Sequence, residues 1–239
     1  IASDPSKIVG KYLLLERIGQ GGMAEVWKAW DSQLHRWVAL KFVKVVNEKV
    51  LKRFVREATL AAQLAHPHVP RVYEIVPEAS RPYLALEYIS GNSLEGTVQN
   101  RKRAAQIIRD AARAVQNAHQ QGILHRDLKP SNVMITPTDD IRLIDFGLVR
   151  FYTLGKTQDT IIMGTPGYAA PEQYGQGQTD PRSDIFSLGA LMHHLLTGID
   201  PSIRPFVFGS VREVNPDVPE HADCALRKPV PTDPHLRFA

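Results

Sequence analysis

The sequence has one cysteine, Cys224, among 239 residues. A single thiol cannot form a disulfide within the chain, and no Cys/His cluster has the spacing of zinc ligands. A fold stapled by disulfides or zinc is therefore excluded. We expect a reducing compartment and predict a cytoplasmic location. No apolar run reaches the ~18 residues of a membrane span, so we expect any membrane attachment only through segments outside this chain.

The chain also has little excess of one charge sign over the other. The formal net charge is +4, from 29 basic and 25 acidic residues, and the excess lies in residues 1–90. So small an imbalance is not the footprint of a nucleic-acid-binding protein, and we predict no nucleic-acid partner. Because hydrophobic residues make up 43% of the chain, the sequence predicts one large domain or two smaller lobes.

Strand patterns and one helical pattern fill the first ninety residues. The apolar and β-branched runs typical of strands are residues 12–18, 24–30, 37–43, 72–76 and 83–88. Residues 50–64 instead place Ala, Leu and Val at helical spacing. We therefore predict a small antiparallel sheet with one helix.

Helical patterns dominate after a boundary near residue 90. Residues 101–121 carry an apolar stripe that Gly122 ends, and residues 184–197 form a more apolar helix pattern that ends at Gly198. The remaining predictions are short strands at 133–135 and 141–144 and an irregular, proline-rich stretch at 199–219.

A glycine-rich turn, Gly19-Gln20-Gly21-Gly22, follows the first predicted strand and leads into the second. Glycines let backbone N–H groups approach an anion without a Cβ in the way. A plain tight hairpin is an alternative interpretation. Because the turn leads into a strand and not a helix, the pattern favours a flap over phosphates rather than a dinucleotide site.

Lys41 ends the apolar run Val38-Ala39-Leu40. Burying an ammonium group costs several kcal/mol unless it is paired, so a buried Lys41 requires a carboxylate partner. Glu57, on the predicted helix that follows, is the candidate. A lysine at a strand edge that reaches water is the alternative.

The densest group of chemically active residues is His125-Arg126-Asp127-Leu128-Lys129-Pro130-Ser131-Asn132, followed by Asp145-Phe146-Gly147. Phosphoryl transfer depends on positioning and charge neutralisation. It needs a base that orients a hydroxyl, an amide oxygen and a second carboxylate that hold Mg²⁺, and a lysine near the transferred group. This segment contains all of these in order.

Together these motifs resemble the eukaryotic-like protein kinase family, and specifically the bacterial serine/threonine protein kinases. The resemblance covers residues 12–238 and implies one catalytic domain, 1–239, cut from a longer protein. The implied fold class is α+β, the two-lobe protein kinase fold. Its N-lobe (11–90) has a small antiparallel sheet and one helix, and its larger C-lobe (91–239) is mainly helical and shortened at its C-terminal end.

The resemblance also implies roles for individual residues. The catalytic group comprises the base Asp127, Lys129, the phosphate-holding Lys41 and its partner Glu57. Asn132 and Asp145 match the ligands of Mg²⁺ or Mn²⁺. The residues implied to bind ATP are Ile18, Gly19, Gly21, Gly22, Val26, Ala39, Lys41, Glu87, Ile89 and Met134. Several of these apolar positions would look no different as core residues.

Three further matches concern the C-lobe. Thr165 resembles the threonine that touches the base and the neighbouring lysine. Asp184 resembles the helix aspartate that pins the catalytic-loop backbone, with a helix N-cap as the alternative. Glu172 and Arg237 match a buried ion pair, which so near the chain end we expect to be held by packing of Leu236 and Phe238.

The implied activity is ATP-dependent phosphoryl transfer to serine or threonine hydroxyls of protein substrates, including the chain itself. We expect autophosphorylation at Thr157 or Thr160, because Arg126 directly precedes the base and can pair with a loop phosphate. One alternative is a pseudokinase, a nucleotide-binding scaffold without transfer activity. Another is a small-molecule kinase of the aminoglycoside type, although Ala170-Pro171-Glu172 and the long loop before it suit a peptide platform.

Overall fold

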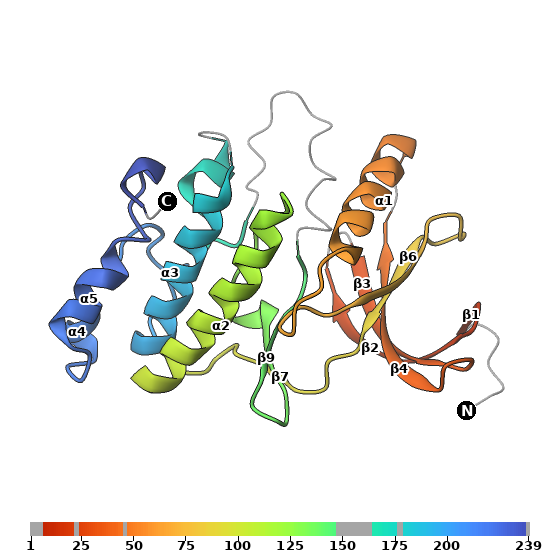
Figure 1. Cartoon of the computed structure of the whole chain (residues 1–239), viewed down its shortest axis with the longest axis horizontal. Helices are drawn as coiled ribbons and strands as arrows, with labels where there is room; N and C mark the ends of the chain where they lie inside the picture. Colours follow the sequence, from red (N-terminus) through yellow and green to blue (C-terminus); the bar gives the residue numbers. More distant parts are fainter. Residues whose placement is uncertain (1–6, 22–23, 45–46, 147–163, 176–178, 238–239) are drawn as a thin grey trace. The chain divides into compact units, whose positions relative to one another are not determined.

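The computed structural model of the chain describes residues 7–21, 24–44, 47–146, 164–175 and 179–237. These residues form two compact units (Figure 1). Unit 1 lies within Ile1–Ala65 and Pro70–Ser90, and unit 2 lies within His66–Val69, Gly91–Gly147 and Lys156–Ala239. Among the described residues, no helix has the length and apolar character needed to cross a bilayer.

Unit 1 is an antiparallel sheet with the strand order β1-β2-β3-β4-β6-β5. The strands are β1 (Ile8–Val9), β2 (Tyr12–Gln20), β3 (Ala24–Asp31), β4 (Arg36–Val43), β5 (Val72–Val76) and β6 (Tyr83–Glu87). All five predicted strands are therefore confirmed, and β1 is an additional short edge strand that pairs with β2.

The alternation of side chains gives this sheet two apolar faces. One face carries its own buried cluster, Tyr12, Leu14, Ala29, Val38, Leu40, Phe42, Tyr83 and Ala85. The other face packs Val43 and Leu84 against Phe54, Ala58 and Ala61 of α1 (Glu48–Ala62). The side chain of Asn47 caps this helix by accepting a hydrogen bond from the N–H of Val50 at 3.0 Å.

Unit 2 contains a small antiparallel sheet, β7-β8-β9, and two long helices that run side by side (Figure 1). The strands are β7 (Asn92–Ser93), β8 (Val133–Ile135) and β9 (Ile141–Leu143), and the helices are α2 (Arg101–Gln120) and α3 (Pro181–Thr197). Gly91, before β7, has φ +150°. A Cβ at this position would lie 2.0 Å from the carbonyl oxygen of Ile135, so only glycine permits this close approach.

The predicted helix at 184–197 begins three residues earlier, at Pro181. Asp180 caps it by accepting from the N–H of Arg182 at 2.8 Å, and Pro181 fits the first helical position because it needs no N–H partner there. Asp184 therefore lies inside the helix, and the N-cap alternative for it is wrong. The helix ends at Gly198 in the left-handed conformation, as predicted.

Two short helices follow: α4 (Val211–Val214) and α5 (Glu220–Arg227). The prediction that residues 199–219 are irregular is wrong for α4. Its first turn is held by a distant carboxylate, Asp223 of α5, which accepts from the N–H of Val211 at 2.7 Å and from the hydroxyl of Ser210 at 2.9 Å. Such a contact between elements leaves no local pattern in the sequence.

The chain end is fastened by a buried ion pair between Arg237 and Glu172. The two guanidinium nitrogens donate to the two carboxylate oxygens at 2.7 and 3.0 Å, and Arg237 also donates to the backbone carbonyls of Pro231, Thr232 and Arg182. Leu236 is 69% exposed, so the expected packing of this side chain is wrong. Phe238 lies outside the described residues. Among the described residues, the hydrogen bonds to backbone carbonyls hold the arginine in addition to Glu172.

We expect Arg237→Ala to lower the free energy of unfolding by about 3 kcal/mol or more, because it strands a buried carboxylate. The melting temperature should fall by roughly 6 °C or more. Calorimetry measures both. Lys52→Ala is the matched control, because Lys52 forms an exposed pair with Glu48 on α1, and it should shift the melting temperature by at most a few degrees. Equal shifts in the two variants would contradict a structural role for the buried pair.

Candidate active site

Asp127 lies in the loop between α2 and β8, where the side chains of Thr165, Lys129 and Asn132 contact its carboxylate. The hydroxyl of Thr165 donates to Asp127 Oδ1 at 2.8 Å, and Lys129 Nζ lies 3.5 Å from Oδ2. Lys129 also donates to the hydroxyl of Thr165 at 3.0 Å. The contacts implied for Thr165 are therefore present, and they place an ammonium group beside a partly accessible carboxylate.

Asn132 follows on the 3-10 turn Pro130–Asn132 and is 6% exposed. Its Nδ2 donates to the carbonyl oxygen of Asp127 at 2.8 Å and to Oδ2 of the same residue at 3.2 Å. With the nitrogen engaged in this way, the amide oxygen is the atom left for a ligand. The amide thus holds Asp127 through its nitrogen, and its oxygen is of the hard type that Mg²⁺ prefers.

Asp145, the second predicted metal ligand, is placed close to Asn132 by the backbone. The N–H of Ile144 donates to the carbonyl oxygen of Asn132 at 3.0 Å. Asp145 has φ +63°, a left-handed conformation that few residues with a Cβ adopt. A carboxylate and an amide oxygen on adjoining segments are the hard donors that Mg²⁺ and Mn²⁺ prefer, so these residues fit such an ion.

The loop backbone is held by Asp184, whose side chain is fully buried in α3. Its Oδ2 accepts from the N–H of His125 at 2.8 Å, and its Oδ1 accepts from the N–H of Arg126 at 2.7 Å. His119 Nε2, in the last turn of α2, lies 2.7 Å from Oδ2. This is the pinning role that the resemblance implies for Asp184.

His119 was not among the residues predicted from the sequence. The only signal for it was a polar side chain in the last turn of α2, a position that a solvated histidine occupies equally well. Burial opposes ionisation of Asp184. The bonds from His119 and the two backbone N–H groups outweigh that penalty and hold the pKa of this carboxyl below its ordinary value.

The side chain of His125 is buried beneath the loop that carries Asp127. Its ring lies 4.5 Å from that of Phe146, and its Nε2 lies 3.1 Å from the carbonyl oxygen of Ile144. Burial lowers the pKa of His125, which favours the neutral imidazole at pH 7. The ring therefore links the loop that carries Asp127 to the segment that carries Asp145 without adding charge.

The predicted nucleotide residues of unit 1 gather on one face of its sheet. Across the strands, Gly19 pairs with Val26, Val26 with Lys41, and Lys41 with Leu84. Ala39 lies two residues before Lys41 and therefore on the same face. Lys41 is 2% exposed, so it is a buried lysine rather than a lysine at a water-facing edge.

Glu57 lies on α1, the helix that packs on this same face of the sheet through Phe54 and Ala58. A carboxylate on this helix is therefore on the correct side of the sheet for Lys41. Their pairing stays a prediction.

The remaining predicted nucleotide residues lie in or just after strands of the two units. Ile18 lies near the end of β2 and is 46% exposed. Gly21 directly follows β2 and donates its N–H to the carbonyl oxygen of Ala24 at 2.8 Å. Glu87 ends β6, and its N–H donates to the carbonyl oxygen of Arg71 at 2.8 Å. Ile89 follows it, and Met134 belongs to unit 2, in β8. The predictions at Gly22, Thr157 and Thr160 fall outside the described residues.

Comparisons with known proteins agree with this geometry. A family model described as "Protein kinase domain" matches residues 12–206. The chain is 39% identical over 82% of its length to the serine/threonine-protein kinase PknB of Mycobacterium tuberculosis and 35% identical over 98% to that of Mycolicibacterium smegmatis. A probable serine/threonine-protein kinase of Streptomyces coelicolor is 32% identical over 98% of the chain. The matches cover 34%, 42% and 39% of these relatives, so the chain spans between a third and a half of their length.

Solved structures show the same fold. The kinase domain of Mycobacterium tuberculosis PknI superposes with a TM-score of 0.78 at 27% identity, over 98% of this chain and 93% of that one. A structure titled "PpkA-294 apo form" gives 0.80 at 26% identity, over 98% and 95%. The predicted α+β two-lobe class is thereby confirmed.

We expect Asp184→Asn to lower the free energy of unfolding by about 2 kcal/mol or more at pH 7, because an amide cannot accept all three bonds. The pKa of Asp184 is lower in the folded than in the unfolded chain. Its stabilisation is therefore present above the ordinary aspartate pKa of about 4 and is lost as the pH falls. Urea unfolding of wild type and variant should show a difference that shrinks below about pH 4.

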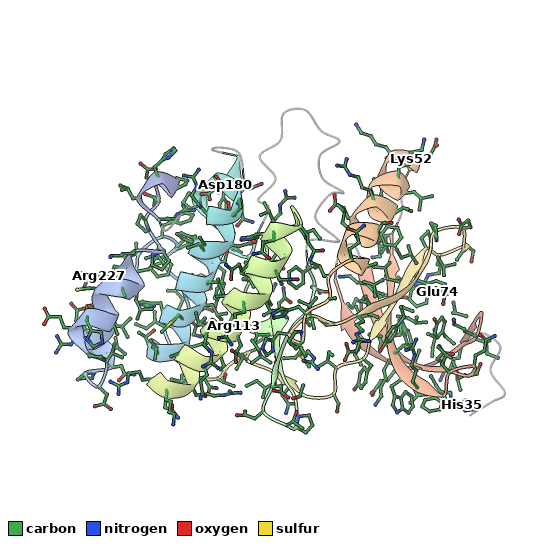
Figure 2. The ribbon with its side chains drawn as sticks, in the orientation of Figure 1. His35, Lys52, Glu74, Arg113, Asp180 and Arg227 are labelled. Atoms are coloured by element: carbon green, nitrogen blue, oxygen red, sulfur yellow. The ribbon has the colours of Figure 1, made fainter. Side chains whose placement is uncertain are left out.

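Asp180→Asn is the control, since Asp180 caps the start of the same helix (Figure 2) and asparagine caps as well as aspartate. It should change stability by less than about 1 kcal/mol. A difference at Asp184 that does not vary with pH would contradict an ionised buried carboxylate.

Proposed function

Since the chain belongs to the family of bacterial eukaryotic-like serine/threonine protein kinase domains, we propose that it transfers the γ-phosphoryl group of ATP to serine and threonine hydroxyls of proteins. The observation that carries this proposal is the bonded group of Asp127, Lys129, Thr165 and Asn132. It combines a base, a cation and an amide oxygen around one site, which is what phosphoryl transfer requires.

In the proposed reaction, the acceptor hydroxyl donates a hydrogen bond to the Asp127 carboxylate. A bond forms between the acceptor oxygen and the γ-phosphorus while the bond from that phosphorus to the β,γ-bridging oxygen breaks. The hydroxyl proton passes to Asp127. Lys129 stabilises the negative charge of the transferred group. Thr165 holds the side chains of Asp127 and Lys129 in place through its hydroxyl.

Asn132 and Asp145 would hold the divalent metal through the amide oxygen and the carboxylate. Mg²⁺ or Mn²⁺, when bound, supplies neutralisation of phosphate charge. Both ions take oxygen ligands, so the donor set suits either. In this arrangement the amide nitrogen of Asn132 continues to hold Asp127, so one residue serves base and metal together.

For the nucleotide, we assign Lys41 to the α and β phosphates, with Glu57 as its partner, and the backbone of Gly19 and Gly21 to the phosphate flap. Burial of Lys41 favours this role, since a buried ammonium group needs an anionic partner. The groups assigned to adenine are the backbone of Glu87 and Ile89 and the side chains of Val26, Ala39 and Met134.

The proposed partners are protein substrates with serine or threonine acceptors, including the chain itself. Use of ATP favours action on the cytoplasmic side of the membrane, with any attachment through segments outside this chain. No observation favours a scaffold without transfer activity, because Lys41, Asp127, Asn132 and Asp145 are all retained. The match to a protein kinase model likewise favours a protein substrate over an aminoglycoside-type small molecule.

Asp127→Asn tests the proposed base. We expect kcat for transfer of labelled phosphate from ATP to a generic basic protein to fall by a factor on the order of 10² or more. The affinity for ATP should change little, because Asp127 contacts the acceptor hydroxyl and not ATP. Asp217→Asn, at an exposed aspartate of unit 2, is the control with unchanged kcat. Unchanged turnover in Asp127→Asn would rule out the assignment.

Phosphorylation at Thr157 or Thr160 is a separate prediction. A phosphothreonine carries about −1.5 to −2 charges and can pair with Arg126, so we expect phosphorylation to raise activity. Mass spectrometry after incubation with Mg-ATP should locate the phosphate, and Asp127→Asn should remain unmodified. An active enzyme with both threonines unmodified would contradict this prediction.

A further inference from the structure

The buried amide of Gln173 links the Ala170-Pro171-Glu172 segment to the backbone in front of Asp127. Its Nε2 donates to the carbonyl oxygen of Arg126 at 2.9 Å, and its Oε1 accepts from the N–H of Ala170 at 3.0 Å. Gln173 is 2% exposed, so water cannot reach these groups to replace either hydrogen bond.

The carbonyl that Gln173 holds belongs to the peptide group that joins Arg126 to Asp127. The N–H of Arg126 is held in turn by Asp184 at 2.7 Å. Side chains from two different segments thus hold both backbone polar groups of Arg126. Its φ is +65°, a left-handed conformation that persists in a residue with a Cβ only when its surroundings enforce it.

The position of Gln173 is itself fixed. Its backbone N–H donates to the carbonyl oxygen of Ala170 at 2.9 Å within the 3-10 turn Pro171–Tyr174. The preceding residue, Glu172, is bound by Arg237 and accepts from the hydroxyl of Ser183 at 2.7 Å. The amide of Gln173 therefore connects two fixed segments: the Glu172–Arg237 ion pair and the loop that carries Asp127.

We propose that Gln173 is a positioning residue for phosphoryl transfer: its amide sets the orientation of the Arg126–Asp127 peptide group and thereby aims the Asp127 carboxylate at the acceptor hydroxyl. This inference rests on the proposed function. Rotation of that peptide group would swing the Cα of Asp127, and misplacement of a reacting group by about 1 Å can cost on the order of 10²-fold in rate. Gln173 does not itself meet the substrate.

Gln173→Met tests the proposal, because methionine is also unbranched and of similar length but has no amide. We expect kcat to fall by a factor of roughly 10 to 10². KM for ATP and for the protein substrate should stay within about twofold, since the variant disturbs the direction of the base and not binding. Assays are run at a temperature at which circular dichroism shows every variant to be folded.

Asn215→Leu is the matched control. Asn215 Nδ2 also donates to a backbone carbonyl, that of Leu196, at 3.1 Å. This variant removes a bond of the same kind from another part of unit 2 and should leave kcat unchanged. A Gln173→Met enzyme with wild-type kcat, or an equal loss of kcat in both variants, would overturn the proposal.

Gln173→Glu decides the question should the methionine variant fail to fold. Its carboxylate can still accept from the N–H of Ala170, but only the protonated form can donate to the carbonyl of Arg126. The charged groups around this position are Glu172 with Arg237, Asp184 on α3, and Arg126 and Asp127 in the loop. We expect kcat relative to wild type to rise as the pH falls from about 8.5 to about 6.5. Wild-type kcat at both pH values would overturn the proposal.

Wild type and Asp127→Asn, assayed beside these variants, separate the two levels of inference. If wild type transfers no phosphate, the proposed function fails. If wild type transfers phosphate and the Gln173 variants match it, only the positioning role fails.

Discussion

The carboxylate of Asp184 is fully buried, and the geometry of the catalytic loop depends on it. A buried ion is stable only when hydrogen bonds replace its water. Here the donors are His119 on α2 and the backbone N–H groups of His125 and Arg126. The helix that carries Asp184 is buried along most of its length, so the packing of the unit 2 core fixes the backbone that presents Asp127.

The Gly164–Gly175 stretch of unit 2 is hydrogen-bonded to the same loop. Thr165 and Lys129 tie the start of the Gly164–Gly175 stretch to Asp127, and Gln173 ties its end to the carbonyl of Arg126. The buried pair of Glu172 and Arg237 then fastens that end to the last described residue of the chain. Asp127, the Gly164–Gly175 stretch and Arg237 therefore belong to one hydrogen-bonded network. Breaking one of its buried pairs would leave a buried charge without its partner, which is costly.

The two units carry different parts of the proposed chemistry. Unit 1 presents Lys41, Val26 and Gly19 as a row across one sheet face, with Glu57 on the helix that covers this face. Unit 2 holds the base and both candidate metal ligands on backbone segments that bond to each other. Each unit has its own apolar cluster, so separate cores position Lys41 in unit 1 and Asp127 in unit 2.

The sequence alone determined the three long helices, most of the strands and the chemical inventory. Strand and helix periods depend on local side-chain spacing, and the motifs around Asp127 and Asp145 are contiguous, so both could be read directly. Tertiary structure decided what depends on contacts between distant segments: that Asp184 pins a loop rather than caps a helix, that Asp223 holds the first turn of α4, and that backbone carbonyls hold the buried side chain of Arg237. His119 and Gln173 belong with these, because a buried polar side chain acquires its role from its partners, and those partners meet only when the chain is folded.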